Sequence, residues 1–262
     1  MIIKEFNEFT WDMVRALPKA NYLKENDIPF KIICKPNLSH LYDSYTDDIE
    51  ERDIFQDINP KSTYSHTRPD FTTKEWIPPS LKKKWSGYLS FDKPTIVIQN
   101  KFAMEWNEGV FNYFSIEFLN ILFNRFKNDY QFIYIRPDGG SKNYYKDKNR
   151  ILEFKDYEFI NNNHSDVITI KDLMQENSSL TFNHLQFAIH STSNIHITTS
   201  GGTACIASYF GGDVFIFDSP NGYGAGRGIW KTDSWLKLLS GASIHGFNDY
   251  HSLYEKLEKE II

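Results

Sequence analysis

The segment from Ser200 to Thr203 has the residue types that bind a phosphate through the protein backbone. It reads Ser-Gly-Gly-Thr and stands between an expected buried strand at 195–198 and a short helix of mostly small residues at 204–208. Such a turn at the start of a helix leaves backbone N–H groups unpaired, and glycine lets a ligand approach without meeting a Cβ atom. The segment therefore predicts a phosphate or diphosphate site, unless the two glycines only close a tight strand-to-helix turn.

A parallel sheet covered by helices on both faces would position this turn. Continuous apolar runs that alternate with helical patterns are typical of that architecture. The expected strands lie at 95–100, 131–136, 167–170, 195–198 and 214–217. The expected helices lie at 112–126, 182–191 and 250–262. Ligands of such sheets bind outside the carboxyl ends of the strands, so the residues directly after each strand are the candidates.

Those strand ends carry cations and hydrogen-bond donors, which together suit a diphosphate. Ile170 is included because the backbone of its strand could pair with the edge of a nucleobase. A single lysine or arginine at a strand end is usually a solvated surface charge, so the argument rests on the set. The candidate donor-binding residues are Asn100, Lys101, Arg136, Ile170, Ser200, Gly201, Gly202 and Thr203.

The first part of the chain predicts a second, smaller unit of the same class. A strand at 2–6, a helix at 11–26 and a strand at 30–34 form a β-α-β opening, and Pro18 should kink or split that helix. Residues 44–85 are polar and irregular. The predicted fold class is α/β, with two Rossmann-like halves that have parallel sheets, the N-terminal half small and irregular.

Composition excludes several function classes. The 262 residues carry 29 basic and 34 acidic side chains, a net charge of −5, which argues against a general nucleic-acid binder. Cys34 and Cys205 each lie in an apolar run and are expected to be buried thiols in a reducing compartment. The sequence shows neither a signal peptide nor a membrane-spanning segment, so we expect a cytoplasmic protein with no membrane span.

The absence of several known motifs argues against further kinds of catalytic and metal sites. There is no P-loop and no Gly-x-Ser-x-Gly elbow, the eight histidines are dispersed, and no Asp-x-Asp follows a strand, so no metal site is expected. A second glycine-rich loop follows the strand at 214–217 and contains Tyr223 and Arg227. We interpret it as a lid or an acceptor-binding loop, although a plain surface loop fits equally well.

Several of these motifs together resemble a known family. The runs 100–106, 112–116, 134–137, 200–203 and 207–212 are similar to the donor half of GT-B glycosyltransferases, most of all the small enzymes encoded by chloroviruses, which include a xylosyltransferase. The similarity covers about residues 95–245. It implies a GT-B-like fold and, if the protein is viral, a location in the host cytoplasm.

The resemblance also implies a function and a division of labour. Residues 94–248 would bind a nucleotide-sugar donor, with UDP as the expected nucleotide and xylose as one possible sugar. Residues 1–93 would bind an oligosaccharide or glycoprotein acceptor, the closing helix at 249–262 could pack back on that half, and the cleft between the halves would be the active site. No metal ion would be needed.

Sugar transfer places negative charge on the departing diphosphate, and an inverting enzyme must also deprotonate the acceptor hydroxyl. The amides of residues 201–203, Lys101 and Arg136 would stabilise that charge. The expected base is Asp70, with His66 and Arg68 binding the acceptor.

The sequence leaves alternatives open for the catalytic base and for the type of activity. Asp70 could be a simple surface acid, and Asp12, Glu8 and His66 are the other candidate bases. The protein could also be a nucleotide-sugar epimerase or hydrolase of the same fold, or a binding module without catalysis.

Overall fold

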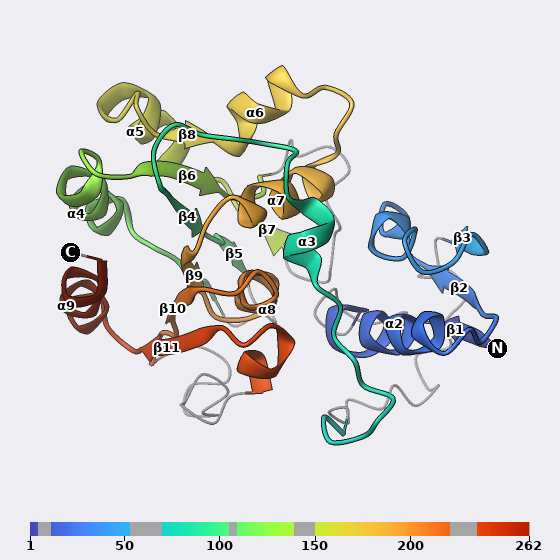
Figure 1. Cartoon of the computed structure of the whole chain (residues 1–262). Helices are drawn as coiled ribbons and strands as arrows, with labels where there is room; N and C mark the ends of the chain where they lie inside the picture. Colours follow the sequence, from blue (N-terminus) through green and yellow to red (C-terminus); the bar gives the residue numbers. More distant parts are fainter. Residues whose placement is uncertain (5–11, 53–69, 105–108, 139–149, 221–234, 262) are drawn as a thin grey trace. The chain divides into compact units, whose positions relative to one another are not determined.

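The computed structural model describes residues 1–4, 12–52, 70–104, 109–138, 150–220 and 235–261 (Figure 1). The chain divides into two compact units, Met1–Pro79 and Ser80–Ile262. Both contain a parallel sheet with helices between its strands. The predicted α/β class is therefore confirmed.

The second unit is built on a six-stranded sheet in which every neighbouring pair is parallel. Its order is β11-β10-β9-β4-β6-β8, so the chain winds outward in both directions from the central pair β4 and β9. A sheet of this topology binds ligands where the strand order reverses, at the carboxyl ends of that central pair. The strands are β4 (Thr95–Gln99), β6 (Gln131–Ile135), β8 (Ile168–Thr169), β9 (Ile195–Thr199), β10 (Asp213–Phe217) and β11 (Ser243–Phe247).

Helices flank this sheet on two sides (Figure 1). One side carries α4 (Ile116–Phe126), α5 (Asp156–Asn163) and α9 (Tyr250–Ile261). The other side carries α3 (Leu81–Trp85), α7 (Phe182–Ser191), α8 (Gly202–Ser208) and the 3-10 turn η4 (Trp235–Leu239), and α6 (Ile170–Glu176) packs against α7. A two-stranded antiparallel ribbon of β5 (Ala103–Met104) and β7 (Arg150–Ile151) adjoins the ends of β4 and β6.

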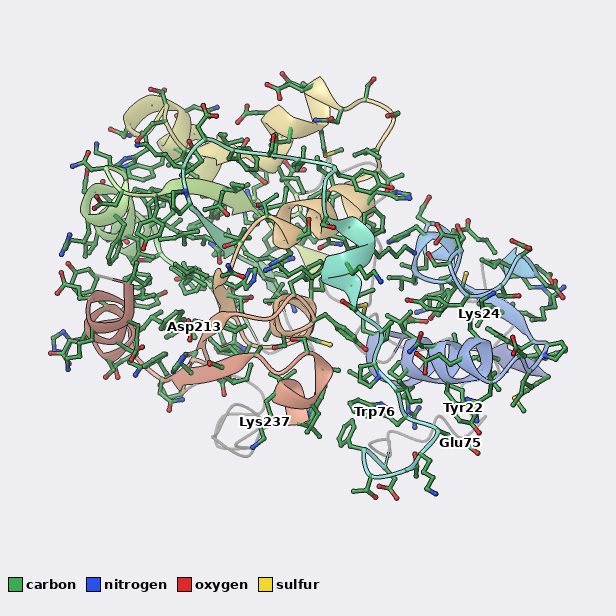
Figure 2. All side chains as sticks on the ribbon, in the orientation of Figure 1. Tyr22, Lys24, Glu75, Trp76, Asp213 and Lys237 are labelled. Carbon is green, nitrogen blue, oxygen red and sulfur yellow. The ribbon has the colours of Figure 1, made fainter. Side chains whose placement is uncertain are left out.

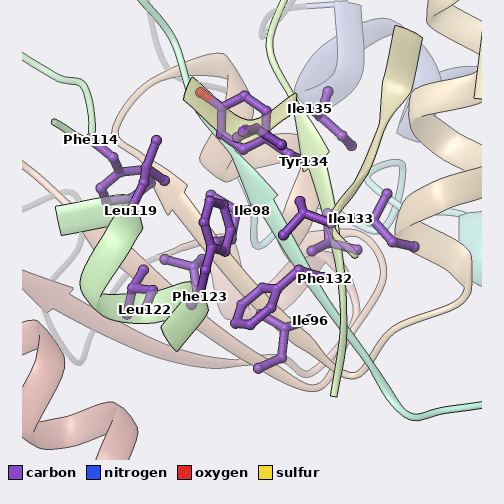
Figure 3. Close-up of a cluster of buried hydrophobic side chains, with 14 of the residues drawn as sticks. Ile96, Ile98, Phe114, Leu119, Leu122, Phe123, Phe132, Ile133, Tyr134 and Ile135 are labelled. Atoms are coloured by element: carbon purple, nitrogen blue, oxygen red, sulfur yellow. The ribbon is translucent and has the colours of Figure 1, made fainter. Parts of the chain in front are cut away.

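Apolar side chains from the central strands and α4 form the core of this unit (Figure 3). Ile96 and Ile98 on β4 are fully buried, as are Leu122 and Phe123 on α4, and Phe123 packs edge-on against Phe132 at 5.1 Å between ring centroids. Helix α4 begins where Ser115 accepts a hydrogen bond from the backbone of Phe118, a typical N-cap. Its apolar residues recur at helical spacing, which buries one face against the sheet.

The first unit has a three-stranded parallel sheet in the order β1-β2-β3. These strands are β1 (Ile2–Lys4), β2 (Lys31–Cys34) and β3 (Ile49–Glu51). A π-helical turn η1 (Asp12–Ala16) leads into α2 (Leu17–Glu25), and a short 3-10 turn η2 (Ser39–Leu41) follows β2.

Pro18 explains why the expected helix at 11–26 is divided. It lies in the first turn of α2, where its missing N–H costs nothing. The end of this unit lies against the same helix: Trp76 donates its indole N–H to the carbonyl of Val14 at 2.7 Å, and Glu75 pairs with Lys19 (Figure 2).

The boundary between the units differs from the expected one at 93/94. Residues after Pro79 belong to the second unit because α3 packs on α7, where Trp85 stacks on Phe187 at 5.7 Å between ring centroids. Lys82 of the same helix donates to the Ser193 carbonyl at 2.8 Å. The short apolar surface of α3 is therefore buried on the larger core.

The closing helix α9 is part of the second unit and packs on its sheet. It contacts β10 and β11, and its Glu258 pairs with Arg125 of α4 at 2.7 Å. Tyr250 stacks on Phe118 at 4.3 Å between ring centroids. Within the described residues, no helix combines the length and the apolar character that crossing a membrane requires.

Candidate functional site

The predicted phosphate-binding turn lies at the carboxyl end of β9, one of the two central strands. Gly201 has φ +110° and ψ −145°, a conformation open essentially to glycine alone. A Cβ atom built on Gly201 would meet no heavy atom within 4 Å. Gly202 then begins α8. The space beside the Gly201 backbone is therefore open, and ligand binding at Gly201 and Gly202 stays a prediction.

Side chains on either side of the two glycines stabilise the turn. The Ser200 hydroxyl donates to the Asp218 carboxylate at 2.8 Å, and its backbone N–H donates to the Phe217 carbonyl at 2.8 Å. Thr203 donates its hydroxyl to the Thr199 carbonyl at 2.7 Å. Both hydroxyls and the Ser200 N–H are engaged within the protein, so of these two residues only Thr203, through its backbone N–H, remains in the candidate phosphate site.

Asn100 has a structural role that the sequence did not predict. Its side chain is fully buried, and Oδ1 accepts from the backbone of Lys101 at 2.9 Å and of Phe114 at 2.8 Å. Its Nδ2 donates to the Phe114 carbonyl at 3.1 Å and to the Tyr134 hydroxyl at 2.9 Å. The amide therefore holds together both ends of the segment that joins β4 to α4, and its hydrogen-bonding groups are occupied.

Arg136 is likewise committed to the protein interior. Only 2% of its side chain is exposed, and Nε and Nη2 form a bidentate pair with the Asp156 carboxylate, the latter at 2.6 Å. Nη1 donates to the Pro137 carbonyl at 3.1 Å. Burial alone would lower the pKa of this guanidinium, but the hydrogen bonds and charge of Asp156 outweigh burial and raise it. The expected role of Arg136 in binding diphosphate is therefore not supported.

Tyrosine hydroxyls complete the hydrogen-bond network around Asp156 and Arg136. Tyr134 donates its hydroxyl to Asp156 at 2.5 Å, and burial followed by the charge of Asp156 raises the pKa of that hydroxyl well above its usual value. The Tyr157 hydroxyl donates to the Arg136 carbonyl. A charged pair in a dry interior needs such extra hydrogen bonds to offset its desolvation. This network fixes the end of β6 and the start of α5.

The other predicted cation, Lys101, differs in its surroundings from Lys171, a second lysine that follows a strand of this sheet. Lys101 is half-buried directly after β4, next to the strand-order reversal. Lys171 forms an ion pair with Asp138 and lies 4.1 Å from the centroid of the Tyr157 ring. Lys101 is thus the predicted cation that suits the turn best.

Ile170 does not extend a strand as expected. A capping box formed by Thr169 and Asp172 ends β8 and begins α6 at Ile170, whose side chain is fully buried. The Asp172 carboxylate already accepts the backbone N–H of Thr169 at 2.8 Å. Pairing between a nucleobase and the extended backbone of 167–170 is therefore not available in the form predicted.

In the first unit, Asp70 has the geometry of a turn-stabilising residue. Its carboxylate accepts the Thr72 hydroxyl at 2.6 Å and the Thr72 backbone N–H at 2.9 Å, and the residue is exposed. These two hydrogen bonds lower the pKa of Asp70. A carboxylate with a lowered pKa is a weaker base, and two of its acceptor positions are already used. The expected role of Asp70 is therefore poorly supported.

Asp12 is the better placed acid of that unit. It is fully buried in the π-helical turn after β1, and the Tyr42 hydroxyl donates to its Oδ1 at 3.3 Å. Burial, followed by the negative charges of Glu51 and Asp12, raises the pKa of the Cys34 thiol to about 12, so these acids lie near the end of β2. Short π-helical segments often occur at functional sites.

Four predicted acceptor residues lie outside the described residues: His66, Arg68, Tyr223 and Arg227. Glu8, an alternative base, does so as well. In the described part of the chain, no group of three or more His, Cys, Asp or Glu side chains could hold a metal ion. Metal independence remains a prediction.

The structure-based comparison identifies the fold. A glycosyl transferase family 9 structure from Veillonella parvula aligns over 98% of this chain and 89% of its own, with a TM-score of 0.53 and 10% sequence identity. The chain has the fold of GT-B glycosyltransferases. No family model matches the sequence, and no curated protein matches it significantly.

Two structures of the wall teichoic acid polymerase TagF, one of them a variant, align less well. Their TM-scores are 0.35 and 0.34, at 12% and 15% identity, and the alignments cover 91% of this chain and 50% and 51% of theirs. The resemblance to chlorovirus enzymes remains a prediction.

Sequence reasoning missed a row of buried polar side chains between β4, β9 and α7. His196 Nδ1 lies 3.2 Å from His190 Nδ1, and His190 Nε2 lies 2.8 Å from Gln99 Oε1. The row continues through Gln186 to Asn183 with two amide hydrogen bonds of 3.1 Å. All five are buried. Neutral histidines satisfy this network, so a charged ring there would be costly.

This row predicts a loss of stability in acid. Burial lowers the pKa of His190 to about 3, and burial followed by the positive charges of His190 and Lys82 places that of His196 well below 6.5. An unfolded histidine titrates near 6.5, so the unfolded chain binds more protons below that pH. Stability is therefore fully present above pH 6.5 and falls as the pH approaches 3.

We expect each histidine to contribute a loss of about 2 kcal/mol between pH 6.5 and pH 5, measured by urea unfolding across that range. Replacing His190 with glutamine should reduce the slope by about one proton. Replacing His251, whose side chain is 82% exposed, should leave it unchanged. Equal slopes in all three proteins would contradict the assignment.

Proposed function

We propose that this protein is a glycosyltransferase that takes its sugar from a nucleoside diphosphate, with UDP as the expected nucleotide. The observation that carries the proposal is the open backbone of Gly201, at the point where the strand order of the sheet reverses. Its position in a GT-B fold supports the proposal, because ligands of doubly wound sheets bind at such points.

The turn would act on the leaving group. As the bond between sugar and phosphate breaks, negative charge grows on the diphosphate, and preorganised N–H donors are the most effective way to stabilise it. The N–H groups of Gly201, Gly202 and Thr203 would supply these donors, and Lys101 would add a positive charge. Arg136 has no part in this proposal. No metal ion is included, since backbone donors and a cation can meet the same requirement.

The acceptor would be a hydroxyl of an oligosaccharide or glycoprotein, and xylose is one candidate for the transferred sugar. In an inverting reaction a base removes the hydroxyl proton as the new bond forms. We assign this role to Asp12 in preference to Asp70, because the Asp70 carboxylate already accepts two hydrogen bonds from Thr72, which lower its pKa. We keep the cytoplasm as the expected location.

Two glycine variants test the diphosphate site. Gly201→Ala places a methyl group where a phosphate would approach, whereas Gly241→Ala adds one at another glycine with positive φ (+80°) and nothing within 4 Å. Both strain the backbone. Only Gly201→Ala should weaken binding, by about tenfold or more, which is at least 1.4 kcal/mol.

The measurement is a thermal-shift titration with UDP, GDP, CDP and dTDP and their sugar conjugates, because a ligand of the folded state raises its apparent stability. If no member stabilises the wild type, or if Gly201→Ala binds as the wild type does, the diphosphate site is refuted.

Consumption of the donor, measured with and without an acceptor, distinguishes a transferase from the other candidate functions. Sugar transferred only when an acceptor is present indicates a transferase. A donor changed without acceptor indicates an epimerase or hydrolase, and a donor bound but never consumed indicates a binding module.

A further inference from the structure

Three aromatic rings gather where the strands of the second unit end. Phe102 follows β4, and Phe154 precedes α5; their rings stack at 4.4 Å between centroids with 11° between planes. Tyr113 meets both rings edge-on, at 5.0 Å from Phe102 and 5.8 Å from Phe154. All three side chains are only half-buried. We call these residues the aromatic trio.

Backbone contacts hold the trio in place. The Leu152 N–H donates to the Phe102 carbonyl at 3.0 Å, beside the pairing of β5 with β7. Tyr250 of α9 donates its hydroxyl to the Tyr113 carbonyl at 2.5 Å. A surface already ordered in this way binds a ligand without a further cost for immobilising its side chains.

Hydrogen bonds also connect the segments that carry the trio and the glycine turn. Asn112, next to Tyr113, accepts the backbone N–H of Ser219 at 2.9 Å. The neighbouring Asp218 accepts the Ser200 hydroxyl at 2.8 Å, and Gly201 follows directly. The trio and the turn therefore belong to one set of linked segments at the carboxyl edge of the sheet.

We propose that the aromatic trio binds the nucleobase of the nucleoside diphosphate donor, an inference that rests on the proposed function. A nucleobase is a flat π-system, and half-buried aromatic rings are its usual stacking partners. With the diphosphate at the turn, the base then extends toward β4 and β6.

A stacking site also leads us to expect weak selectivity among nucleobases. Every nucleobase has a π-face, so a stacking site discriminates weakly among bases. Several nucleoside diphosphates should therefore bind with similar affinity, while inorganic pyrophosphate, which has no base, should bind more weakly than any of them.

Leucine variants of the two stacked residues test the assignment. Phe102→Leu and Phe154→Leu keep apolar bulk and remove the ring. We expect each to weaken binding of UDP, GDP, CDP and dTDP by about 5- to 100-fold and to leave inorganic pyrophosphate unaffected. Phe71→Leu is the matched control, because Phe71 is a half-buried ring paired with Trp76 at 4.9 Å in the first unit; it should bind all ligands normally.

Proton NMR of the wild type provides a test that needs no variant. Base protons of UDP that stack on aromatic rings should move upfield on binding, by more than the ribose protons do. If nucleotides bind but their base protons do not shift, or if both leucine variants bind nucleotides normally, the trio is not the base site and the proposed function stands. If neither pyrophosphate nor any nucleotide binds the wild type, the proposed function itself fails.

Discussion

Replacing Arg136 with methionine is expected to lower the free energy of unfolding by about 3–5 kcal/mol, because it leaves the Asp156 carboxylate charged and buried without its partner. The side chains of this pair are 2% and 0% exposed. Urea unfolding monitored by circular dichroism would measure the loss. Tyr134 would retain its hydrogen bond to Asp156 but could not neutralise the charge.

Arg125→Met is the matched control for this prediction. Arg125 pairs with Glu258 at 2.7 Å, but both side chains are 38% exposed, and exposed pairs of this kind contribute about 0–1 kcal/mol. A small effect at Arg136, equal to that at Arg125, would show that the buried pair does not stabilise the fold. If Arg136→Met folds with full stability but no longer binds nucleotides, the original prediction of a phosphate ligand would be restored.

Replacing Asp12 with asparagine is expected to reduce sugar transfer by about 10²- to 10⁴-fold, the usual contribution of a general base. Asparagine has the same shape and can still accept the Tyr42 hydroxyl, but it cannot take a proton from an acceptor. Binding of the nucleotide in the second unit should be unchanged. The measurements are initial rates of transfer and the thermal shift produced by UDP.

Asp70→Asn is the companion variant. It removes a carboxylate that is exposed and engaged with Thr72, so transfer should stay close to the wild-type rate. The opposite pattern, with Asp70→Asn inactive and Asp12→Asn active, would return the role of base to Asp70. Loss of UDP binding in Asp12→Asn would contradict a role confined to the acceptor side.

The sequence predicted the helices and strands that can be recognised from neighbouring residues alone. The helix at Phe182–Ser191 begins and ends as expected, and β4, β6 and β10 each contain a run of consecutive apolar residues. Strand β9 coincides with the strand expected at 195–198, where Ile195 and Ile197 are the apolar residues. Strands buried on both faces of a parallel sheet need such runs, so they are easily recognised. The conformation of the turn at Gly201 was also predictable, since glycine is the default residue where the backbone must adopt a positive φ.

Other features depend on residues far apart in the chain, and the sequence does not reveal them. The strand expected at 167–170 ends early because of the capping box from Thr169 to Asp172. Arg136 was expected to bind diphosphate, but its guanidinium pairs with Asp156, which lies 20 residues later in the chain. Asn100 is similar, since its amide bonds to Phe114 and Tyr134. Single positions at strand ends therefore predict a site only when their tertiary partners are known.

The aromatic trio was missed for the same reason, although a weak signal exists. Phe102 comes three residues after the last residue of β4, and Phe154 two residues before the first residue of α5, both in segments that reach the carboxyl edge of the sheet. A chain with 16% aromatic residues has many such positions. The stacking became visible only in three dimensions.

The row of polar side chains inside the second unit determines where two protons reside. Gln99 offers its oxygen to His190, so Nε2 of His190 carries the hydrogen. Its Nδ1 must then accept, and His196 must donate from Nδ1. The two rings are thus opposite tautomers, and every donor in the row points the same way, from His196 toward Asn183. Reversing the direction of one hydrogen bond would require both histidines to change tautomer and all the amide groups to flip.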